Sequence, residues 1–280
     1  MGDNFLWQRL ERQLDNMVLA FPGVAGIAVK DLSDGHSIAI RGHEEFPTAS
    51  TIKIHILTQL LSRAQRGEID LTLKVNITAD MRVVGSGIIS HLGEDIQLTV
   101  LDIAILMIIV SDNTATNMCI DWAGIEETNT LLRDMGLTST ILRRKMQDRP
   151  AIIRGDENVS TPVECVAMLE LLHNGKPSPE ISKTCLEILK KPKNGPLNRA
   201  IPQNLSIANK PGAMDRVVCD AGIVYLPNRP YAVAIMTKFA IEDPLRNEVF
   251  VLETAKIIHQ TMLALDETNP FGLGVPHTTK

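Results

Sequence analysis

The sequence lacks the features that mark several classes of protein. It has no dense run of basic residues, and 28 basic against 33 acidic side chains give a formal net charge of −5. This balance favours solubility and argues against a nucleic-acid partner. The strongly apolar run Leu101–Val110 is too short to span a bilayer and predicts a core helix. We therefore expect no transmembrane segment.

Cysteine is scarce as well. The four cysteines, Cys119, Cys165, Cys185 and Cys219, show no C-x-x-C spacing and have no pair of histidines nearby. A zinc site is not expected from such a pattern, which predicts buried free thiols instead.

The N-terminus shows no signal-peptide pattern, because the acidic Asp3 comes early and Phe5–Leu19 has the spacing of an amphipathic helix. We expect either a cytoplasmic protein or an exported one whose signal peptide is not included in this sequence. No internal repeat and no low-complexity tract is present, and nothing in the sequence predicts the oligomeric state.

The hydrophobic pattern predicts a helix, two strands, a long helical block, three strands and a last helix. With 280 residues, 44% of them apolar, the chain can form one large domain or two intertwined ones. Ser33–Gly35 predicts a hairpin turn between strands 24–32 and 37–41. Thr161 and Pro162 are typical of a helix start. The helices are expected at 5–19, 48–66, 100–110, 114–122, 126–135, 161–173, 182–190 and 243–265, and the later strands at 205–210, 217–226 and 231–238.

Three short motifs could carry chemistry: Ser50–Lys53, Ser111–Asn113 and Lys210–Gly212. Ser50 and Lys53 share one face of a helix, and the positive helix N-terminus favours an oxyanion near Ser50. Lys53 could take the Ser50 proton if burial or a neighbouring cation lowers the pKa of its amine. Each motif alone has a plainer interpretation, as a helix cap with a solvated lysine, a capped loop and the end of a strand.

Taken together, in this order and at these spacings, the motifs resemble the Ser-x-x-Lys, Ser-Asp-Asn and Lys-Thr-Gly elements of class A β-lactamases and penicillin-binding proteins. The resemblance covers nearly the whole chain. It implies a mixed α/β fold, in which an antiparallel five-stranded sheet is flanked by the N- and C-terminal helices and carries an inserted all-α subdomain. The implied ranges are 1–45 and 205–265 for the α/β subdomain and 46–204 for the insertion with the nucleophile. Because it lies at the chain end, the tail 266–280 is expected to be disordered.

The resemblance also implies roles. Ser50 would be the nucleophile, Lys53 its general base, and Ser111 a proton relay to the leaving group. The backbone N–H groups of Ser50 and Ala213 would form an oxyanion hole, and Gly85–Gly87 would lie on the wall of the cleft. The implied catalytic residues are Ser50, Lys53, Ser111 and Lys210, and the implied substrate-binding residues are Asn113, Gly212 and Ala213. No metal or organic cofactor is needed for this chemistry.

One departure from the family concerns a loop glutamate that activates the deacylating water. Its place falls on Met146, or on Gln147 if the register slips by one residue. Neither side chain can act as a base. Asp148 is the nearest carboxylate and a possible substitute. Asp156 is expected to pair with one of the arginines at 143 and 144 and so to hold the loop.

A second departure is Pro211, which stands where the family usually has threonine or serine. Proline offers neither a hydroxyl nor a backbone donor. A penicillin carboxylate would lose one hydrogen bond, worth about 1–3 kcal/mol.

These observations lead to one main hypothesis. The chain is expected to be a serine hydrolase that acts on a small-molecule ester, amide or lactam, with at most weak β-lactam hydrolysis. The alternatives are a genuine class A β-lactamase that uses Asp148 as base, a sensor that is acylated or binds a ligand without turnover, and an inactive scaffold with remnants of the motifs.

Overall fold

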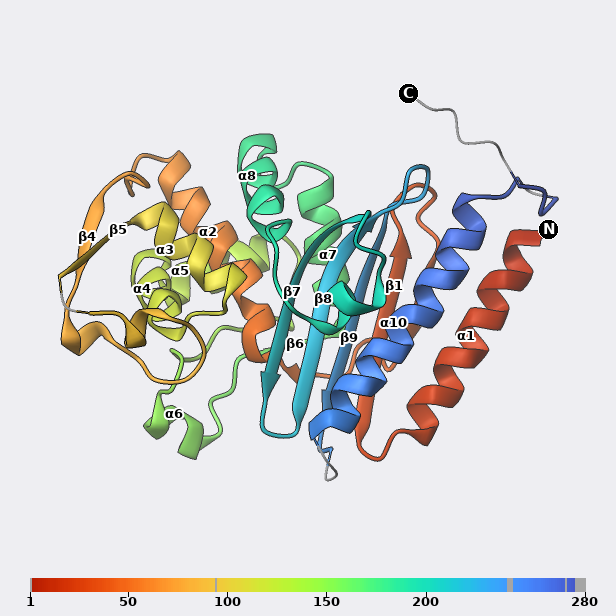
Figure 1. Cartoon of the computed structure of the whole chain (residues 1–280), viewed down its shortest axis with the longest axis horizontal. Coiled ribbons are helices and arrows are strands. Elements are labelled where there is room, and N and C mark those ends of the chain that lie inside the picture. The colour runs from red at the N-terminus through yellow and green to blue at the C-terminus, as the bar shows by residue number, and fades with distance from the viewer. Residues whose placement is uncertain (1, 94, 241–243, 270, 275–280) are drawn as a thin grey trace. The chain divides into compact units, whose positions relative to one another are not determined.

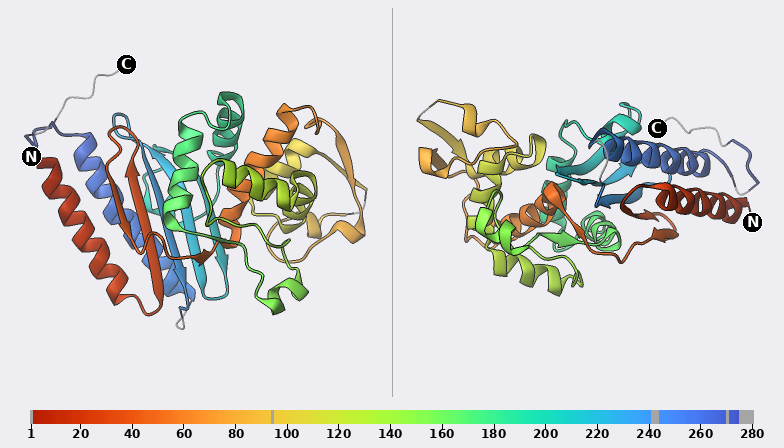
Figure 2. Two further views of the ribbon diagram at one scale, coloured as in Figure 1. Left: turned by 180° about the vertical axis from the view of Figure 1, so that it is seen from behind. Right: turned by 90° about the horizontal axis from the view of Figure 1, so that it is seen from below.

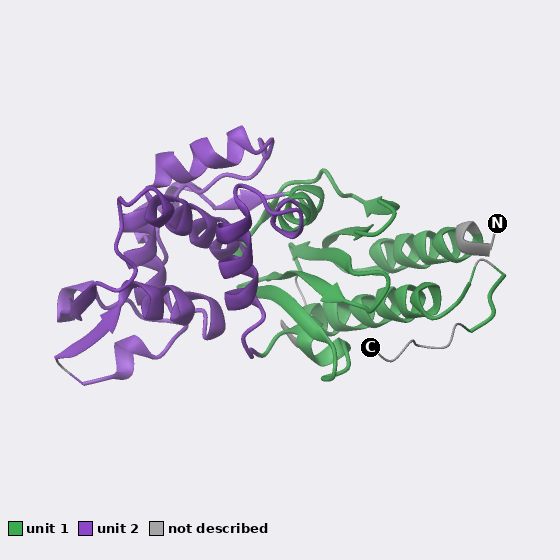
Figure 3. Ribbon diagram, turned by 90° about the horizontal axis from the view of Figure 1, so that it is seen from above, with its two compact units in different colours: residues 1–49, 161–170, 194–280 green, residues 50–160, 171–193 purple. Residues whose placement is uncertain are grey.

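The computed structural model describes residues 2–93, 95–240, 244–269 and 271–274 and contains two compact units. Unit 1 comprises residues 1–49, 161–170 and 194–280, and unit 2 comprises residues 50–160 and 171–193 (Figure 3). The expected ranges differ from these, because residues 46–49, 161–170 and 194–204 belong to unit 1. One reason is that residues 161–170 pack on the sheet of unit 1, where Cys165 contacts Met236.

Unit 1 is built on a five-stranded antiparallel sheet, in agreement with the expected fold. The strands follow the order β2-β1-β9-β8-β7 within the described residues. Asp31 accepts hydrogen bonds from the backbone N–H and the hydroxyl of Ser33, at 2.8 and 2.6 Å, and Gly35 (φ +81°) completes the predicted hairpin turn. The strands are β1 (Val24–Asp31), β2 (Ser37–Ile40), β7 (Ser206–Met214), β8 (Val217–Tyr225) and β9 (Tyr231–Lys238), with the short β3 at Phe46–Pro47.

Helices cover both faces of this sheet, which explains why its central strands are apolar almost throughout. The terminal helices α1 (Gly2–Ala20) and α10 (Pro244–Asp266) lie side by side on one face (Figures 1 and 2). Leu10 and Leu14, one turn apart on α1, are fully buried there. Residues 162–170 of α7 (Pro162–His173) cover the other face, and α9 (Pro196–Ala200) packs against β7 and β8.

Lys210–Gly212 does not end its strand, as the sequence suggested, but lies inside β7, which continues to Met214. Pro211 pairs with Asp220 of β8. Because β7 is the last strand in the sheet order, the missing N–H of a proline is tolerated on its outer side. Edge position therefore explains how the third motif accommodates a proline.

Unit 2 is organised around α2 (Lys53–Gln65), whose residues from Lys53 to Ser62 are all buried. A 3₁₀ turn, η1 (Ala49–Ile52), precedes α2, so Ser50 lies just ahead of the α-helix rather than in its first turn. The helices that pack on α2 are α3 (Val100–Ile109), α4 (Asn113–Ala123), α5 (Ile125–Asp134) and α8 (Pro179–Leu189). Thr99 and Asp102 form a capping box on α3, and Ser178 caps α8.

Unit 2 also contains elements that the sequence did not predict. The strands β4 (Lys74–Ile77) and β5 (Ile96–Thr99) form an antiparallel pair, so the unit is mostly rather than wholly helical. The six-residue α6 (Arg149–Arg154) begins at the cap Asp148. Two further 3₁₀ turns lie at Ala79–Met81 and Ile89–His91, and the short β6 at Val159–Ser160.

The predicted disordered tail begins too early. Asp266 still belongs to α10, and its carboxylate accepts the backbone N–H groups of Asn228 and Arg229 at 2.7 and 2.6 Å. Thr268 pairs with Gly274, while residues 270 and 275–280 lie outside the described residues. No helix in the described part of the chain has the length and apolarity needed to cross a membrane.

Candidate active site

Three of the predicted site residues form a continuous hydrogen-bonded path in unit 2. The Oγ of Ser111 lies 2.8 Å from Oγ of Ser50 and 2.9 Å from Nζ of Lys53. Lys53 also donates to the backbone oxygen of Ser111 at 2.9 Å, and its side chain is fully buried. Ser111 thus bridges the serine and the lysine. Hydroxyl hydrogens can rotate, so a proton can pass in either direction along this path.

The backbone is strained at Ser111 and at the residue before Ser50. Ala49, immediately before Ser50, has φ +45°, and Ser111 itself has φ +56°. Non-glycine residues rarely adopt this left-handed conformation, and such strain gathers at functional sites. The two strained positions lie where the hydroxyls of Ser50 and Ser111 come close to the buried amine of Lys53.

Asp112 anchors the second motif. Its carboxylate accepts the N–H groups of Ile88 and Ile89 at 2.7 and 2.8 Å, and it caps α4 by accepting from Ala115 at 2.9 Å. A Cβ on Gly87 would lie 2.3 Å from this carboxylate, so only glycine fits there. Asp112 is therefore a structural residue that ties the loop 85–89 to the start of α4.

Asn113 holds the same loop from its other end. Its Nδ2 donates to the backbone oxygen of Val84 at 3.1 Å, and its backbone N–H donates to the backbone oxygen of Ser86 at 2.9 Å. The Gly85–Gly87 segment therefore packs directly on the second motif. Asn113 is only 6% exposed, so its side chain is fixed rather than free in solvent.

The loop around Met146 is held by polar contacts. Asn117, on α4, donates to the backbone oxygen of Met146 at 3.1 Å and accepts its N–H at 2.7 Å. Arg144 pairs with Glu157 at 2.6 Å, whereas Asp156 pairs with Arg154 at 2.8 Å. The expected bond from Asp156 to Arg143 or Arg144 is therefore wrong, because the neighbouring carboxylate takes the place. Sequence reasoning missed Asn117 altogether.

Asp148, the possible substitute base, has a structural task. Its Oδ1 accepts the N–H of Ala151 at 3.1 Å and so caps α6. The hydrogen-bonded path that joins Ser50, Ser111 and Lys53 does not include it. Its use as a base remains a prediction.

The third motif lies in unit 1 and is described by itself. Lys210 is 1% exposed, and its Nζ donates to the backbone oxygen of Pro211 at 2.8 Å. Asn209 donates to the buried Asp220 at 2.9 Å, which fixes β7 beside Lys210. Gly212 and Ala213 follow in register opposite Cys219 and Val218. The predicted action of Lys210, Gly212 and Ala213 on a substrate held at Ser50 stays a prediction.

Cysteine and metal chemistry find less support in the structure. All four cysteines are free and buried, as predicted, and burial raises the pKa of the Cys119, Cys185 and Cys219 thiols. Buried thiols of raised pKa are inert as nucleophiles. Among the described residues no three His, Cys, Asp or Glu side chains are placed to hold a metal ion.

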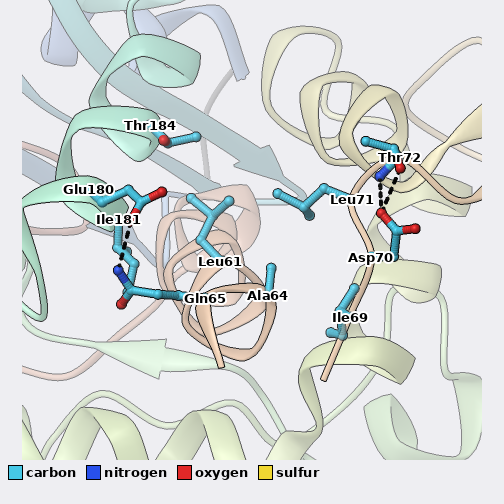
Figure 4. Close-up of a pocket in the computed structure, with 10 residues that line it drawn as sticks. All are labelled: Leu61, Ala64, Gln65, Ile69, Asp70, Leu71, Thr72, Glu180, Ile181 and Thr184. Carbon is cyan, nitrogen blue, oxygen red and sulfur yellow. Dashed lines mark hydrogen bonds between the residues drawn. The ribbon is translucent and has the colours of Figure 1, made fainter. Parts of the chain in front are cut away.

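A cavity of about 310 Å³ lies at the opposite end of α2 (Figure 4). Four of its polar side chains are bonded in pairs: Gln65 donates to Glu180 at 3.1 Å, and Asp70 accepts from the hydroxyl of Thr72 at 2.7 Å. Ser50 is separated from it by the length of α2, roughly 18 Å at 1.5 Å per residue. None of the residues that line the cavity belongs to the three motifs, so we do not place the active site there.

Comparison with known proteins agrees with the geometry. The sequence profile of the β-lactamase enzyme family matches residues 9–262. The β-lactamase ROB-1 of Haemophilus influenzae is 27% identical over 262 residues, which cover 90% of this chain and 84% of that protein.

Two solved structures resemble the chain as a whole. A β-lactamase from Sphaerobacter thermophilus has a TM-score of 0.84 and 28% identity, covering 90% of this chain and 96% of the other. A mutant of PBP-A, solved as its acyl-enzyme complex with penicillin-G, has a TM-score of 0.82 and 28% identity, covering 91% and 97%.

Proposed function

Because the chain belongs to the β-lactamase enzyme family, we propose that it is a serine hydrolase that cleaves an ester or amide through an acyl-enzyme on Ser50. The observation that carries the proposal is the path from Ser50 through Ser111 to the buried Lys53, with steps of 2.8 and 2.9 Å. A nucleophile within hydrogen-bond reach of its base is the signature of covalent catalysis.

The mechanism follows from this path. The Oγ of Ser50 attacks the substrate carbonyl carbon while its proton moves to the Oγ of Ser111, whose own proton moves to Nζ of Lys53. This step requires an uncharged Lys53. When the tetrahedral intermediate collapses, the bond to the leaving group breaks, and the proton returns through Ser111 to that group. Water then attacks the ester on Ser50, releases the acid and restores the serine.

Hydrolysis of the acyl-enzyme is expected to be the slow step. Met146 and Gln147 offer no carboxylate at the place where the family has its water-activating glutamate, and the backbone of Met146 is fixed by Asn117. A general base contributes about 10²–10⁴-fold to such a step. We therefore propose at most weak β-lactam turnover. The related PBP-A mutant, captured with penicillin-G attached, supports acylation by a lactam in a protein of this fold.

A second candidate is a genuine β-lactamase in which Asp148 activates the water. The β-lactamases among its relatives favour this candidate, and Asp148 lies two residues from Met146. Its bond to Ala151, which caps α6, weighs against a role as base.

Intact-protein mass spectrometry tests the proposal. The protein is mixed with a chromogenic cephalosporin and, separately, with a small p-nitrophenyl ester, while product release is followed. We expect a lasting adduct on wild type, little cephalosporin turnover, and no adduct on Ser50→Ala. Ser37→Ala, an exposed serine of β2, is the matched control and should react like wild type.

Two outcomes would contradict it. Wild type without any adduct and without turnover would refute acylation at Ser50. Fast cephalosporin turnover without an adduct would favour the Asp148 candidate, and Asp148→Asn should then abolish it.

A further inference from the structure

Three sulfur-containing side chains converge inside unit 1, between the sheet and α7. The Sγ of Cys165, on α7, donates to the Sδ of Met236, on β9, at 3.9 Å. Cys219 of β8 is in register with Met236, and residues paired across two strands point to the same face of a sheet. Their Cβ atoms are then about 4.5–5.5 Å apart. Two thiols and one thioether therefore share one region of the core.

The two thiols are close enough to influence each other. Burial raises the pKa of the Cys219 thiol most, and the neighbouring Cys165 raises it further. The Sγ of Cys219 also lies 3.5 Å from the backbone oxygen of Pro47, in β3, and β3 contacts β9. Cys165 is 3% exposed, Cys219 and Met236 are fully buried, and neither cysteine is in a disulfide. The protein core thus encloses the three side chains.

Two thiols and a thioether suit a soft metal ion. Such ligands select Cu(I), whereas a structural zinc site takes four ligands from cysteine, histidine or carboxylates. With metal–sulfur bonds of about 2.3 Å, two ligands of a planar three-coordinate site lie about 4.0 Å apart. The 3.9 Å between the sulfur atoms of Cys165 and Met236 matches this spacing. The set therefore fits a three-coordinate Cu(I) ion better than zinc.

A route for an ion leads from the surface toward these side chains. A cavity of about 140 Å³ lies between α7 and the strands β1 and β2, and its lining includes the exposed Ser37 and the buried Ala28. Ala28 is paired with Ala234, which is two residues before Met236 and therefore on the same face of the sheet. Only small alanine side chains of the sheet thus separate the cavity from Met236.

We propose that Cys165, Cys219 and Met236 form a binding site for Cu(I). The ion replaces the protons of both thiols, which pass to solvent, and three copper–sulfur bonds form without any change in oxidation state. The site keeps one net negative charge, spread over the two thiolates. Binding does not depend on acylation at Ser50. Because Cys219 is also in register with Gly212, its strand lies directly beside the third motif.

Competition for copper tests the proposal. Cu(I), supplied as its acetonitrile complex in anaerobic buffer, is shared between the full-length protein and a chelator that absorbs visible light when it holds Cu(I). Wild type should take up one tightly bound equivalent. Cys165→Ser and Cys219→Ser should each weaken binding about 100-fold or more, because even the loss of a group behind a ligand costs about 10–100-fold. Cys185→Ser, at a buried thiol of unit 2, is the matched control and should bind like wild type.

X-ray absorption at the copper edge tests the ligand set on wild type, so it decides the question even if a cysteine variant fails to fold. It should show three sulfur neighbours at about 2.3 Å. Met236→Leu, which conserves side-chain volume, should reduce them to two. The inference is overturned if wild type binds no copper or holds it by nitrogen or oxygen. It is also overturned if either cysteine variant keeps the wild-type affinity or Cys185→Ser loses it.

Discussion

The nucleophile region and the loop around Met146 are both held by several hydrogen bonds, but their side chains differ in chemistry. Ser111 is held in a strained conformation beside Asp112, whose carboxylate accepts three backbone N–H groups. Met146 is held just as firmly by the two hydrogen bonds of Asn117. The first region presents a nucleophile and a base, and the second presents a thioether. Backbone hydrogen bonding is thus similar in the two regions, and the identity of the side chain decides which chemistry each one can perform.

The largest effect is expected from breaking the nucleophile region at Lys53. Lys53→Met keeps the buried stem and removes the amine that receives the Ser50 proton. The rate of ester acylation should fall about 10³-fold, within the range of a general base. Stopped-flow release of p-nitrophenol measures it, and Lys74→Met, at an exposed lysine on β4, serves as control. Unchanged acylation with retained far-UV circular dichroism would exclude Lys53 as the base.

The second prediction concerns the loop around Met146, where a substitution should add a function. Met146→Glu places a carboxylate on the backbone that Asn117 holds, so a water near the acyl group gains a base. We expect hydrolysis of a cephalosporin acyl-enzyme to accelerate about 10²-fold. The decay of the adduct, followed by mass spectrometry, measures this. Met81→Glu adds the same charge on a different segment and should leave the adduct lifetime unchanged. If the adduct on Met146→Glu lasts as long as the adduct on wild type, position 146 does not face the ester.

A smaller effect, on stability, is expected from His55, two residues beyond Lys53 on α2. Burial lowers the pKa of His55 to about 4 from an ordinary value of 6.5. Because the unfolded chain binds this proton more tightly, stability present above pH 6.5 is lost as the pH falls toward 4. The free energy of unfolding should decrease by about 2 kcal/mol between pH 7 and pH 5 from this group alone.

Urea unfolding at both pH values checks this effect by difference. Between pH 7 and pH 5, the free energy of unfolding of His55→Leu should decrease by about 2 kcal/mol less than that of wild type. His43→Leu, at an exposed histidine of unit 1, should retain the full sensitivity. Equal pH dependence in all three proteins would mean that His55 is protonated in the native state.

Features defined by local sequence were predicted well. The turn at Ser33–Gly35 and the start of α7 at Thr161 and Pro162 depend on residues whose conformational preferences are strong. These features need only neighbours in sequence.

Features defined by contacts between distant segments were not predicted. Asn117 lies on α4 and Met146 on a loop 29 residues away, so no local pattern reveals their bonds. Asp156 and Glu157 are adjacent carboxylates, and only the path of the loop decides which one meets Arg144. The strands β4 and β5 have four residues each, too few for alternation to distinguish them from a loop.

Pro211 has a consequence for encounters between molecules. An exposed edge strand is a template on which another extended chain can add by main-chain hydrogen bonds. β7 is the last strand in the order of its sheet, and Pro211 removes one backbone donor near its middle. A second protein chain could not extend the sheet there with an unbroken ladder. Pro211, which we expect to weaken recognition of a substrate carboxylate, is thus also expected to disfavour strand-by-strand aggregation at this edge.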